Sequence, residues 1–250
     1  MNAGPDLSIV IPVHDEEGIV AEACRELAAS LGRRRWSFEI LLCENGSRDG
    51  TVEVLEKLCR EDGRVRALHF AEPNYGRALR DGIQAARGRL VVADEIDLCD
   101  VEFYDRALPL LEGGAADMVV GSKRAPGSVD RRPAYRRAAT WAHNSLLRVA
   151  LGFEGTDTHG VKAFVRDRMA PVAGRCLVEK DVFASEFVLR AGLEGRRVVE
   201  IPVDLREKRP PSIGLLRRVP GVLFQVARLL WLLRVRAPAR RPARGPVDER

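Results

Sequence analysis

The sequence predicts an α/β fold built on a mostly parallel sheet with helices on both faces. Two observations support this prediction. Short apolar runs rich in β-branched residues recur along the first half of the chain, and a segment with helical spacing of its apolar residues follows each run. Strands that recur with a helix between each pair require crossover connections, which produce parallel pairing and a sheet that is covered on both sides.

The first half of the chain alternates strands and helices regularly. The expected strands cover residues 7–13, 38–43, 65–70, 90–94 and 117–122. The expected helices cover residues 18–31, 51–61, 75–88 and 103–114. The apolar residues of these helices recur at spacings of three and four, whereas the strands are short and almost continuously apolar.

The second half of the chain is less regular. A basic stretch at residues 123–137 precedes an expected helix at 138–152. Two further strands are expected at 161–165 and 197–203, with a helix at 182–195 between them. These segments are expected to complete a single globular domain that ends at residue 213.

Composition and charge limit the class of protein. The 250 residues are 46% hydrophobic and 31% charged, which excludes collagen-like, coiled-coil and wholly disordered chains. The net charge is +5, and residues 212–250 hold nine arginines against two acidic residues. A near-neutral domain with a basic end indicates an anionic surface such as lipid headgroups as partner, and no nucleic acid.

Cysteine spacing and the N-terminal residues indicate the compartment. The five cysteines include no C-x-x-C pair, so neither a disulfide framework nor a zinc site is expected. The first residues lack a basic region and a small-residue cleavage site, so no signal peptide is expected. The expected location is the cytoplasm, with peripheral attachment to the cytoplasmic face of the membrane left open.

Residues 214–236 predict an amphipathic helix rather than a membrane span. A span needs about 20 nearly uninterrupted apolar residues, but Gln225 and Arg228 interrupt this segment. The expected apolar face consists of Leu215, Val219, Val222, Leu223, Val226, Leu229, Leu230 and Leu233. With arginines beside it, this face is expected to dock on a membrane surface. Packing on its own domain or in a homo-oligomer is the alternative, and residues 237–250 are expected to be a disordered basic tail.

Acidic side chains follow three of the predicted strands. Glu16 and Glu17 follow the first, Glu44 ends the second, and a run from Asp94 to Asp100 follows the fourth. In parallel α/β sheets ligands bind at this edge. Like charges are costly together unless a cation compensates them, and carboxylates suit a hard divalent metal that is left partly open for substrate phosphates. The sequence therefore predicts a site for a metal and a phosphate.

Each acidic cluster also has a purely structural explanation. Glu16 and Glu17 can complement the dipole of the helix that follows them. Asp49 can cap the second helix, and the run at 94–100 can be a solvated loop. The position of the clusters after successive strands favours a site.

Five motifs stand in order along the chain, namely IPVHDEE, CENGSRDGT, YGRALRDGI with ARG, LVVADEIDLCD and MVVGSKR. Together they resemble family 2 glycosyltransferases of the GT-A fold, and in layout the dolichyl- and polyprenyl-phosphate mannose or glucose synthases. The resemblance implies a Rossmann-like nucleotide-diphospho-sugar transferase domain. It also implies inverting transfer of mannose or glucose from a GDP- or UDP-hexose to a polyprenyl-phosphate lipid, with Mg²⁺ or Mn²⁺ as cofactor.

The resemblance assigns the donor site residue by residue. Without a gap, ADEID places Glu95 and Asp97 on the DxD motif of the family. These two residues are the implied catalytic and metal-binding carboxylates, with Asp97 as the direct ligand, and an alternative frame replaces Glu95 by Asp94. The implied nucleotide-binding residues are Pro12, His14, Glu16, Glu44, Asn45, Gly46, Arg77 and Asp94. Glu44, Asn45 and Glu95 depart from the aspartates that are usual in the family.

The resemblance also concerns the acceptor side of the site. A lipid phosphate is already an anion and needs no general base, and Ala184 occupies the position where the family commonly has an acidic residue. The residues that can hold such a phosphate are Lys123, Arg124, Arg136, Arg137 and His159. Two alternatives remain. One is a soluble hydroxyl acceptor with Asp181 or Glu186 as the base, and the other is a catalytically silent binding module.

Overall fold

The structure is a computed structural model that describes residues 4–179, 182–205 and 215–232. The strands of the central sheet are β1 (Leu7–Val13), β2 (Phe38–Asn45), β3 (Val65–Phe70), β4 (Leu90–Ala93), β5 (Met118–Ser122), β7 (Lys162–Val165) and β8 (Val198–Pro202). They lie in the order β3-β2-β1-β4-β7-β5-β8. Neighbours pair in parallel except where β7 meets β4 and β5. A separate parallel pair joins β6 (Val129–Asp130) to β9 (Asp204–Leu205).

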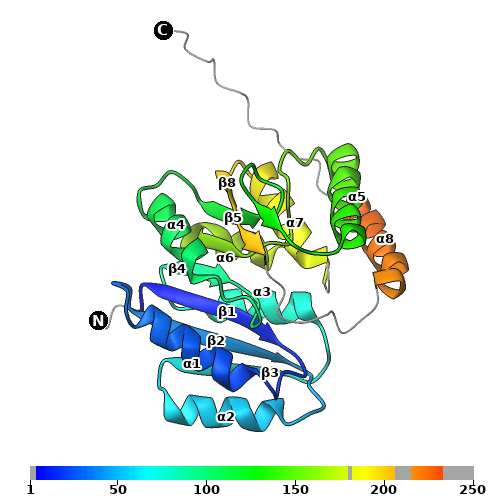
Figure 1. Cartoon of the computed structure of the whole chain (residues 1–250). Helices are drawn as coiled ribbons and strands as arrows, with labels where there is room; N and C mark the ends of the chain where they lie inside the picture. Colours follow the sequence, from blue (N-terminus) through cyan, green and yellow to red (C-terminus); the bar gives the residue numbers. More distant parts are fainter. Residues whose placement is uncertain (1–3, 180–181, 206–214, 233–250) are drawn as a thin grey trace.

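Helices cover both faces of the sheet (Figure 1). They are α1 (Val20–Leu31), α2 (Thr51–Glu61), α3 (Tyr75–Ala85), α4 (Val101–Glu112), α5 (Ala134–Leu151), α6 (Arg166–Gly174), α7 (Phe183–Leu193) and α8 (Leu215–Trp231). One hydrophobic cluster joins the sheet to α1, α2 and α4, and a second joins it to α3, α6 and α7 with α5 and α8. No helix within the described residues is both long enough and apolar enough to cross a bilayer.

Strand β1 shows why the runs in the sequence are apolar throughout. Leu7, Ile9 and Ile11 enter the cluster on the α1 side, whereas Val10 enters the cluster on the α3 side. Because side chains alternate between the two faces of a strand and helices cover both faces here, nearly every position needs an apolar residue. Ser8 is the polar exception in β1, and its hydroxyl donates to Glu39 Oε1 (2.6 Å). The predicted α/β fold with a mostly parallel sheet is confirmed.

The structure corrects three details in the second half of the chain. The basic stretch before the predicted helix at 138–152 is partly helical, because α5 already begins at Ala134, directly after Pro133. Helix α6 was not predicted, since Pro171 inside it breaks the helical pattern in the sequence. Strands β6 and β9 were also not predicted, because each holds two residues and shows no periodicity.

Helix α8 uses part of its apolar face to pack on the domain. Val226 and Leu229 are buried in the same cluster as Leu147 of α5, so these two residues are not free for a membrane as the sequence predicted. Leu223 and Phe224 of α8 remain exposed. The predicted tail at 237–250 and the side chains of Leu215, Val219, Val222 and Leu233 lie outside the described part of the chain.

Candidate functional site

The loops that follow β1 and β2 are tied together at the carboxyl edge of the sheet. The backbone N–H of Asp15 donates to Ser47 Oγ (3.1 Å), and that of Arg48 donates to Asp15 Oδ1 (2.8 Å). Gly50 N–H donates to Glu17 Oε2 (3.0 Å). Glu17 therefore serves the start of α2, rather than the helix that follows it in the sequence. These polar side chains fix the loop geometry.

The N-terminus of α2 engages two more acidic residues of these loops. Asp49 Oδ1 accepts a hydrogen bond from the backbone N–H of Thr51 (3.1 Å), but the N-cap of α2 is Gly50 and no side chain caps the helix, so the expected capping role of Asp49 is wrong. The backbone N–H of Glu16 donates to Thr51 Oγ1 (2.9 Å), which places Glu16 at the junction of both loops.

His14 and Asn45 connect the first two loops to the start of α3. His14 Nδ1 lies 2.8 Å from the carbonyl oxygen of Asn45, so this nitrogen carries the proton and donates. Asn45 Oδ1 accepts from the backbone N–H of Asn74 at 2.5 Å. Gly46 follows with φ +68°, and a Cβ there would lie 2.9 Å from the backbone of Pro73. Only glycine satisfies both conditions.

Glu44 is a buried carboxylate below these loops. The residue is 3% exposed, and its Oε1 accepts from the backbone N–H of Ser47 at 2.5 Å. Its Oε2 lies 3.7 Å from His69 Nδ1 at the end of β3. Pro12 lies within β1, opposite Cys43 of β2. The first strand-end residues are therefore brought together as the sequence predicted.

Arg77 lies at the N-terminal end of α3 with an exposed side chain. Its Nε is 3.5 Å from Asp81, and its guanidinium is 5.9 Å from the centre of the Phe70 ring. Both contacts are near the surface, so each contributes little to stability. The side chain can turn toward a ligand at the sheet edge at small cost.

Asp94 and Glu95 have opposite environments in the loop after β4. Asp94 is 3% exposed, and its Oδ2 accepts from the hydroxyl of Tyr104 (2.6 Å). Its Oδ1 accepts from the backbone N–H of Glu95 (2.8 Å). Burial raises the pKa of Asp94 to about 7, although both hydrogen bonds oppose this change. Glu95 is exposed and Asp97 is half-buried, so both carboxylates are in contact with solvent.

The described residues form no group of three or more histidine, cysteine or acidic side chains that could hold a metal ion alone. A Mg²⁺-type site often needs only one or two carboxylates because substrate phosphates and water complete it. Glu95 and Asp97 offer hard oxygen ligands at an accessible edge, so their chemistry fits such an ion. Asp100 is engaged at the start of α4, where Oδ1 accepts from Phe103 N–H (3.1 Å).

Lys123 and Asp157 join the loop after β5 to the loop before β7. Lys123 Nζ lies 3.6 Å from Asp157 Oδ2, and Asp157 Oδ1 accepts from the backbone N–H of His159 (3.0 Å). Asp157 is fully buried. Burial opposes its ionisation, but Lys123 and the His159 N–H outweigh that effect and lower the pKa of Asp157. This buried ion pair fixes the two loops relative to each other.

Two histidines meet beside this ion pair. The rings of His143 and His159 lie 5.0 Å apart between centroids and nearly edge to face. Two hydroxyl groups connect the histidines in a chain. Ser185 Oγ lies 3.2 Å from His143 Nε2 and 2.8 Å from Thr158 Oγ1. Thr158 Oγ1 in turn lies 3.1 Å from His159 Nδ1. His159 keeps an exposed edge, but loss of water around its ring lowers the pKa, as it does for His143. Both imidazoles are neutral at pH 7.

Glu186 is not available as a general base. It is fully buried, and its Oε2 accepts from the backbone N–H groups of Leu177 (2.9 Å) and Val178 (2.6 Å). Its Oε1 accepts from Arg190 Nε (2.6 Å). The sequence-based alternative that used Glu186 as the base is therefore wrong, because its carboxylate is occupied in holding α7. The other candidate base, Asp181, lies outside the described residues.

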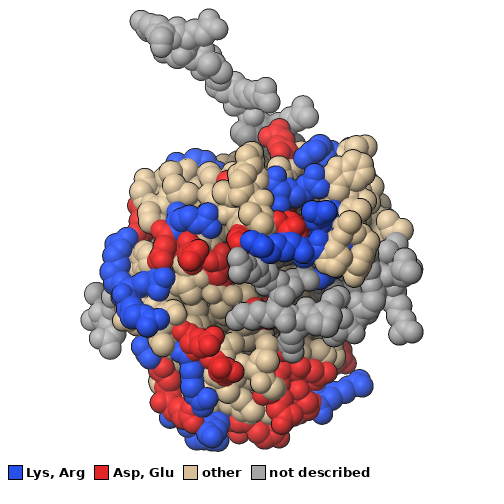
Figure 2. Space-filling view, in the orientation of Figure 1, with Lys and Arg blue, Asp and Glu red and all other residues tan. Residues whose placement is uncertain are grey.

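The predicted arginines lie on the surface of the same half. Arg124 and Arg137 are exposed, and Arg136 is half-buried in the first turn of α5. The backbone N–H of Arg124 donates to Ser122 Oγ (3.1 Å), which shapes the turn after β5. Lys and Arg side chains border the otherwise uncharged surface over α5 in Figure 2.

Backbone packing brings the loop before β7 against β5. A Cβ on Gly160 would lie 1.7 Å from the carbonyl oxygen of Gly121, a distance that no side chain tolerates. The backbone N–H of Gly121 donates to Val161 O (2.8 Å). The loop that carries Asp157 and His159 is therefore held directly on the end of β5.

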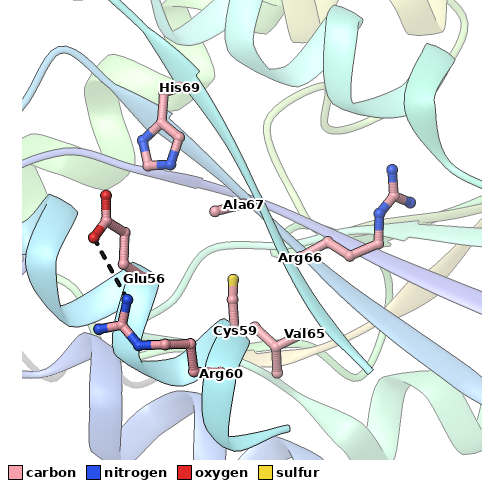
Figure 3. Close-up of a pocket in the computed structure, with 7 residues that line it drawn as sticks. All are labelled: Glu56, Cys59, Arg60, Val65, Arg66, Ala67 and His69. Atoms are coloured by element: carbon pink, nitrogen blue, oxygen red, sulfur yellow. Dashed lines mark ion pairs between the residues drawn. The ribbon is translucent and has the colours of Figure 1, made fainter. Parts of the chain in front are cut away.

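A shallow hollow of about 390 Å³ lies elsewhere, at the outer edge of the sheet. Figure 3 shows its lining residues on α2 and β3, namely Glu56, Cys59, Arg60, Val65, Arg66, Ala67 and His69. None of them belongs to the predicted site. The hollow therefore carries no argument about the donor or the acceptor.

The fold and this edge define a class, the GT-A glycosyltransferases with a Rossmann-like sheet. Glucosyl-3-phosphoglycerate synthase from Mycobacterium tuberculosis, solved with Mn²⁺, UDP and its product, matches with a TM-score of 0.61 and 19% identity over 92% of this chain and 80% of that one. The family model "Glycosyl transferase family 2" matches residues 8–170. The chain belongs to glycosyl transferase family 2.

Two curated glycosyltransferases are similar to this chain in sequence. Glycosyltransferase AglD of Haloferax volcanii is 30% identical over 94% of this chain, which spans only 38% of that protein. Undecaprenyl-phosphate mannosyltransferase of Micrococcus luteus is 27% identical over 80% of this chain and 83% of its own length.

Sequence analysis missed several residues around the Lys123–Asp157 pair, in the half of the edge that the sequence predicts to bind the acceptor. His143, Thr158, Ser185 and Lys162 take part in buried polar contacts there, yet none was singled out. Lys162 had a recognisable signal, because a lysine is unusual in a short strand that is otherwise apolar. The other three stand in ordinary helix and loop patterns and gave no signal.

Proposed function

We propose that this protein transfers a hexose from a nucleoside diphosphate to the phosphate of a polyprenyl lipid. Mannose and glucose are the expected sugars, with GDP or UDP as the carrier. The relatives support a lipid-phosphate acceptor, since the Micrococcus luteus protein is named for undecaprenyl phosphate. The observation that carries the proposal is a pair of solvent-accessible carboxylates, Glu95 and Asp97, at the same edge of the sheet as the Lys123–Asp157 ion pair, without Glu186 as a base.

The chemistry follows from this arrangement. A phosphate oxygen of the acceptor attacks the anomeric carbon on the side opposite the nucleoside diphosphate. The new C–O bond forms as the bond to the diphosphate breaks, and the leaving diphosphate keeps the electron pair, so the configuration inverts. A divalent ion at Glu95 and Asp97 would neutralise the charge that accumulates on this leaving group. Lys123 is the described cation best placed to hold the attacking phosphate.

The loop geometry supports the assignment of Glu95 with Asp97 as the acidic pair. Asp94 already accepts hydrogen bonds on both of its oxygens and is shielded from water by Tyr104. Glu95 and Asp97 keep solvent contact. A ligand of the metal must reach the substrate phosphates, and this favours the ungapped register over the frame that uses Asp94.

Direct assay tests the proposal. The purified protein is incubated with radiolabelled UDP-glucose or GDP-mannose and Mn²⁺, and with undecaprenyl phosphate or a water-soluble hydroxyl acceptor. We expect transfer to the lipid phosphate alone, and its loss in EDTA. Equal transfer to the soluble acceptor contradicts the lipid assignment. Binding of donor without turnover on any acceptor would support the silent-module alternative.

We also propose that the protein meets its lipid at the membrane surface through α5 and α8. These helices pack side by side (Figure 1), and each exposes large apolar side chains. Trp141 and Val149 of α5 are 57% and 84% exposed, and Phe224 and Trp231 of α8 are 72% and 54% exposed. Aromatic residues with neighbouring arginines suit the interfacial region of an anionic bilayer.

Liposome sedimentation tests this surface. A double variant, Trp141→Ser with Phe224→Ser, is expected to lose most of its binding to vesicles that contain phosphatidylglycerol. Leu177→Ser is the matched control, because Leu177 is exposed apolar surface (46%) outside both helices. Unchanged sedimentation of the double variant contradicts this surface. If the wild type ignores vesicles and is a dimer that the double variant splits, the two helices form a subunit interface instead.

A further inference from the structure

Lys162 is the first residue of β7 and lies where the two loops of the site meet. Strand β7 runs antiparallel to its neighbours, so its beginning lies at the edge where β4 and β5 end. Lys162 is opposite Ala93 of β4 on one side and Val120 of β5 on the other. The acidic loop starts directly after Ala93, and Lys123 follows three residues after Val120.

The ammonium group of Lys162 is buried, with one hydrogen-bond partner among the residues that the structure describes. The residue is 3% exposed, and Nζ donates to the carbonyl oxygen of Gly160 at 2.7 Å. Among the described residues no carboxylate lies within 4.0 Å of Nζ, the limit for an ion pair. An ammonium has three N–H donors, so two of them have no partner in the described part of the chain. Burial of such a charge is costly unless a counter-charge arrives.

The charged groups around Lys162 belong to both loops. Its electrostatic neighbours are Asp157, Lys123, Glu95 and Asp94. Asp157 is already paired with Lys123 and with the His159 N–H. Asp157 is therefore the ion-pair partner of Lys123, and Lys162 has no ion-pair partner of its own among the described residues. Burial lowers the pKa of Lys162 to about 8, with Asp157 opposing the change, so the side chain is still protonated at neutral pH.

We propose that Lys162 and Lys123 together form a phosphate-binding site at the junction of the two loops, with the unpaired N–H groups of Lys162 as donors. This inference deepens the proposed function and rests on it. The phosphate belongs either to the diphosphate of the donor or to the phosphate of the lipid acceptor, because both must approach this junction. A phosphate supplies the counter-charge that Lys162 lacks in the free protein.

Binding measurements with Lys162→Met test the site. The probes are UDP and GDP with Mn²⁺, their nucleosides, and farnesyl phosphate with farnesol as its uncharged partner. Lys57→Met is the matched control, since Lys57 lies on the outer surface of α2 with a side chain that is 67% exposed. Lys162→Gln is a second variant, and thermal melting verifies that each variant is folded.

We expect Lys162→Met to weaken the binding of one phosphate probe by roughly tenfold to a hundredfold, as for the loss of a hydrogen bond between charged groups. Weaker binding of UDP or GDP, but not of the nucleosides, assigns the site to the donor. Weaker binding of farnesyl phosphate, but not of farnesol, assigns it to the acceptor. Lys57→Met is expected to match the wild type with every probe.

Two outcomes overturn the inference and are distinct from each other. If the wild type binds nucleotide or farnesyl phosphate and both Lys162 variants bind them equally well, Lys162 is only structural and the proposed function stands. If the folded wild type binds no phosphate probe at all, the phosphate site and the proposed function fail together.

Discussion

The two halves of the sheet edge hold their charges in different ways. On the donor side, the loops after β1 and β2 are joined by backbone-to-side-chain hydrogen bonds near the surface, and Glu95 and Asp97 remain in contact with water. On the acceptor side, Asp157, Lys162 and Glu186 are almost wholly buried. Glu44 and Asp94 are also buried, but the proposed donor side keeps two accessible carboxylates for substrate to complete, whereas the proposed acceptor side holds the carboxylates of Asp157 and Glu186 in ion pairs inside the protein.

This difference predicts that the largest functional effect comes from a residue with little structural role. Asp97→Ala is expected to reduce transfer at least about a hundredfold, since it removes a carboxylate that pairs with no cation among the described residues and that we propose as a metal ligand. Its melting temperature is expected to stay that of the wild type. Asp167→Ala is the control, with an acidic side chain 79% exposed on α6. Undiminished turnover of Asp97→Ala with EDTA present removes the metal from the mechanism.

Substitution of Glu186, on the proposed acceptor side, is expected to lower the stability of the protein strongly, unlike substitution of Asp97. Glu186→Ala leaves Arg190 and two backbone N–H groups buried without their acceptor, so we expect a loss of roughly 3–5 kcal/mol in the free energy of unfolding. Urea denaturation measures it. Glu194→Ala, which breaks a partly exposed pair with Arg175, is expected to cost less than about 1 kcal/mol. A Glu186→Ala protein with normal stability and no transfer would make Glu186 the catalytic base.

Lys162 is proposed to bind phosphate and also affects the stability of the fold. The dependence of the free energy of unfolding on pH measures its effect on stability. Folding lowers the pKa of Lys162 from 10.5 to about 8, so the unfolded chain binds more protons between these values and the free energy of unfolding rises with pH in that window. Lys162→Met removes this contribution. It is expected to be more stable than the wild type below pH 8, by an amount on the order of 3 kcal/mol that shrinks toward pH 10. Parallel stability profiles for the two proteins from pH 7 to 10 contradict the prediction.

The smallest expected effect distinguishes two adjacent carboxylates. Glu95→Gln is expected to weaken Mn²⁺-supported binding of the donor nucleotide by about tenfold. Asp94→Asn is expected to weaken it less, because Asp94 contacts Tyr104 rather than solvent. Titration of nucleotide at fixed Mn²⁺ compares the two variants. If Asp94→Asn weakens donor binding more than Glu95→Gln does, the first carboxylate of the acidic pair is Asp94 instead of Glu95.

The comparison of the two halves also explains what the sequence could predict. The donor side consists of strand–loop–helix units in which a motif such as CENGSRDGT is contiguous, so the strand and its loop residues were located together. Its loops meet because parallel strands end at one edge. What the pattern could not show was the burial of Asp94, which depends on Tyr104 in the next helix.

The acceptor side depends on contacts between distant segments. The hydrogen bonds that connect His143 to Thr158 pass through Ser185, which is 42 residues from His143. No local pattern encodes that meeting. The direction of β7 also determines that Lys162 lies at the functional edge, and a strand of four residues does not reveal its direction. The basic residues could be nominated from the sequence, but their burial and pairing could not.

The contact between Gly160 and Gly121 sets a rule for anyone who recombines this enzyme with its relatives. The two glycines belong to different segments: a Cβ on Gly160 would meet the backbone of Gly121, and a Cβ on Gly121 would meet the side chains of Val161 (2.7 Å) and Val203 (2.8 Å). A chimera that imports the loop at 155–161 without the matching end of β5 would force the two backbones apart. The loop at 155–161 and strand β5 should therefore be exchanged together. In a random library, variants with a side chain at position 160 or 121 are expected not to fold.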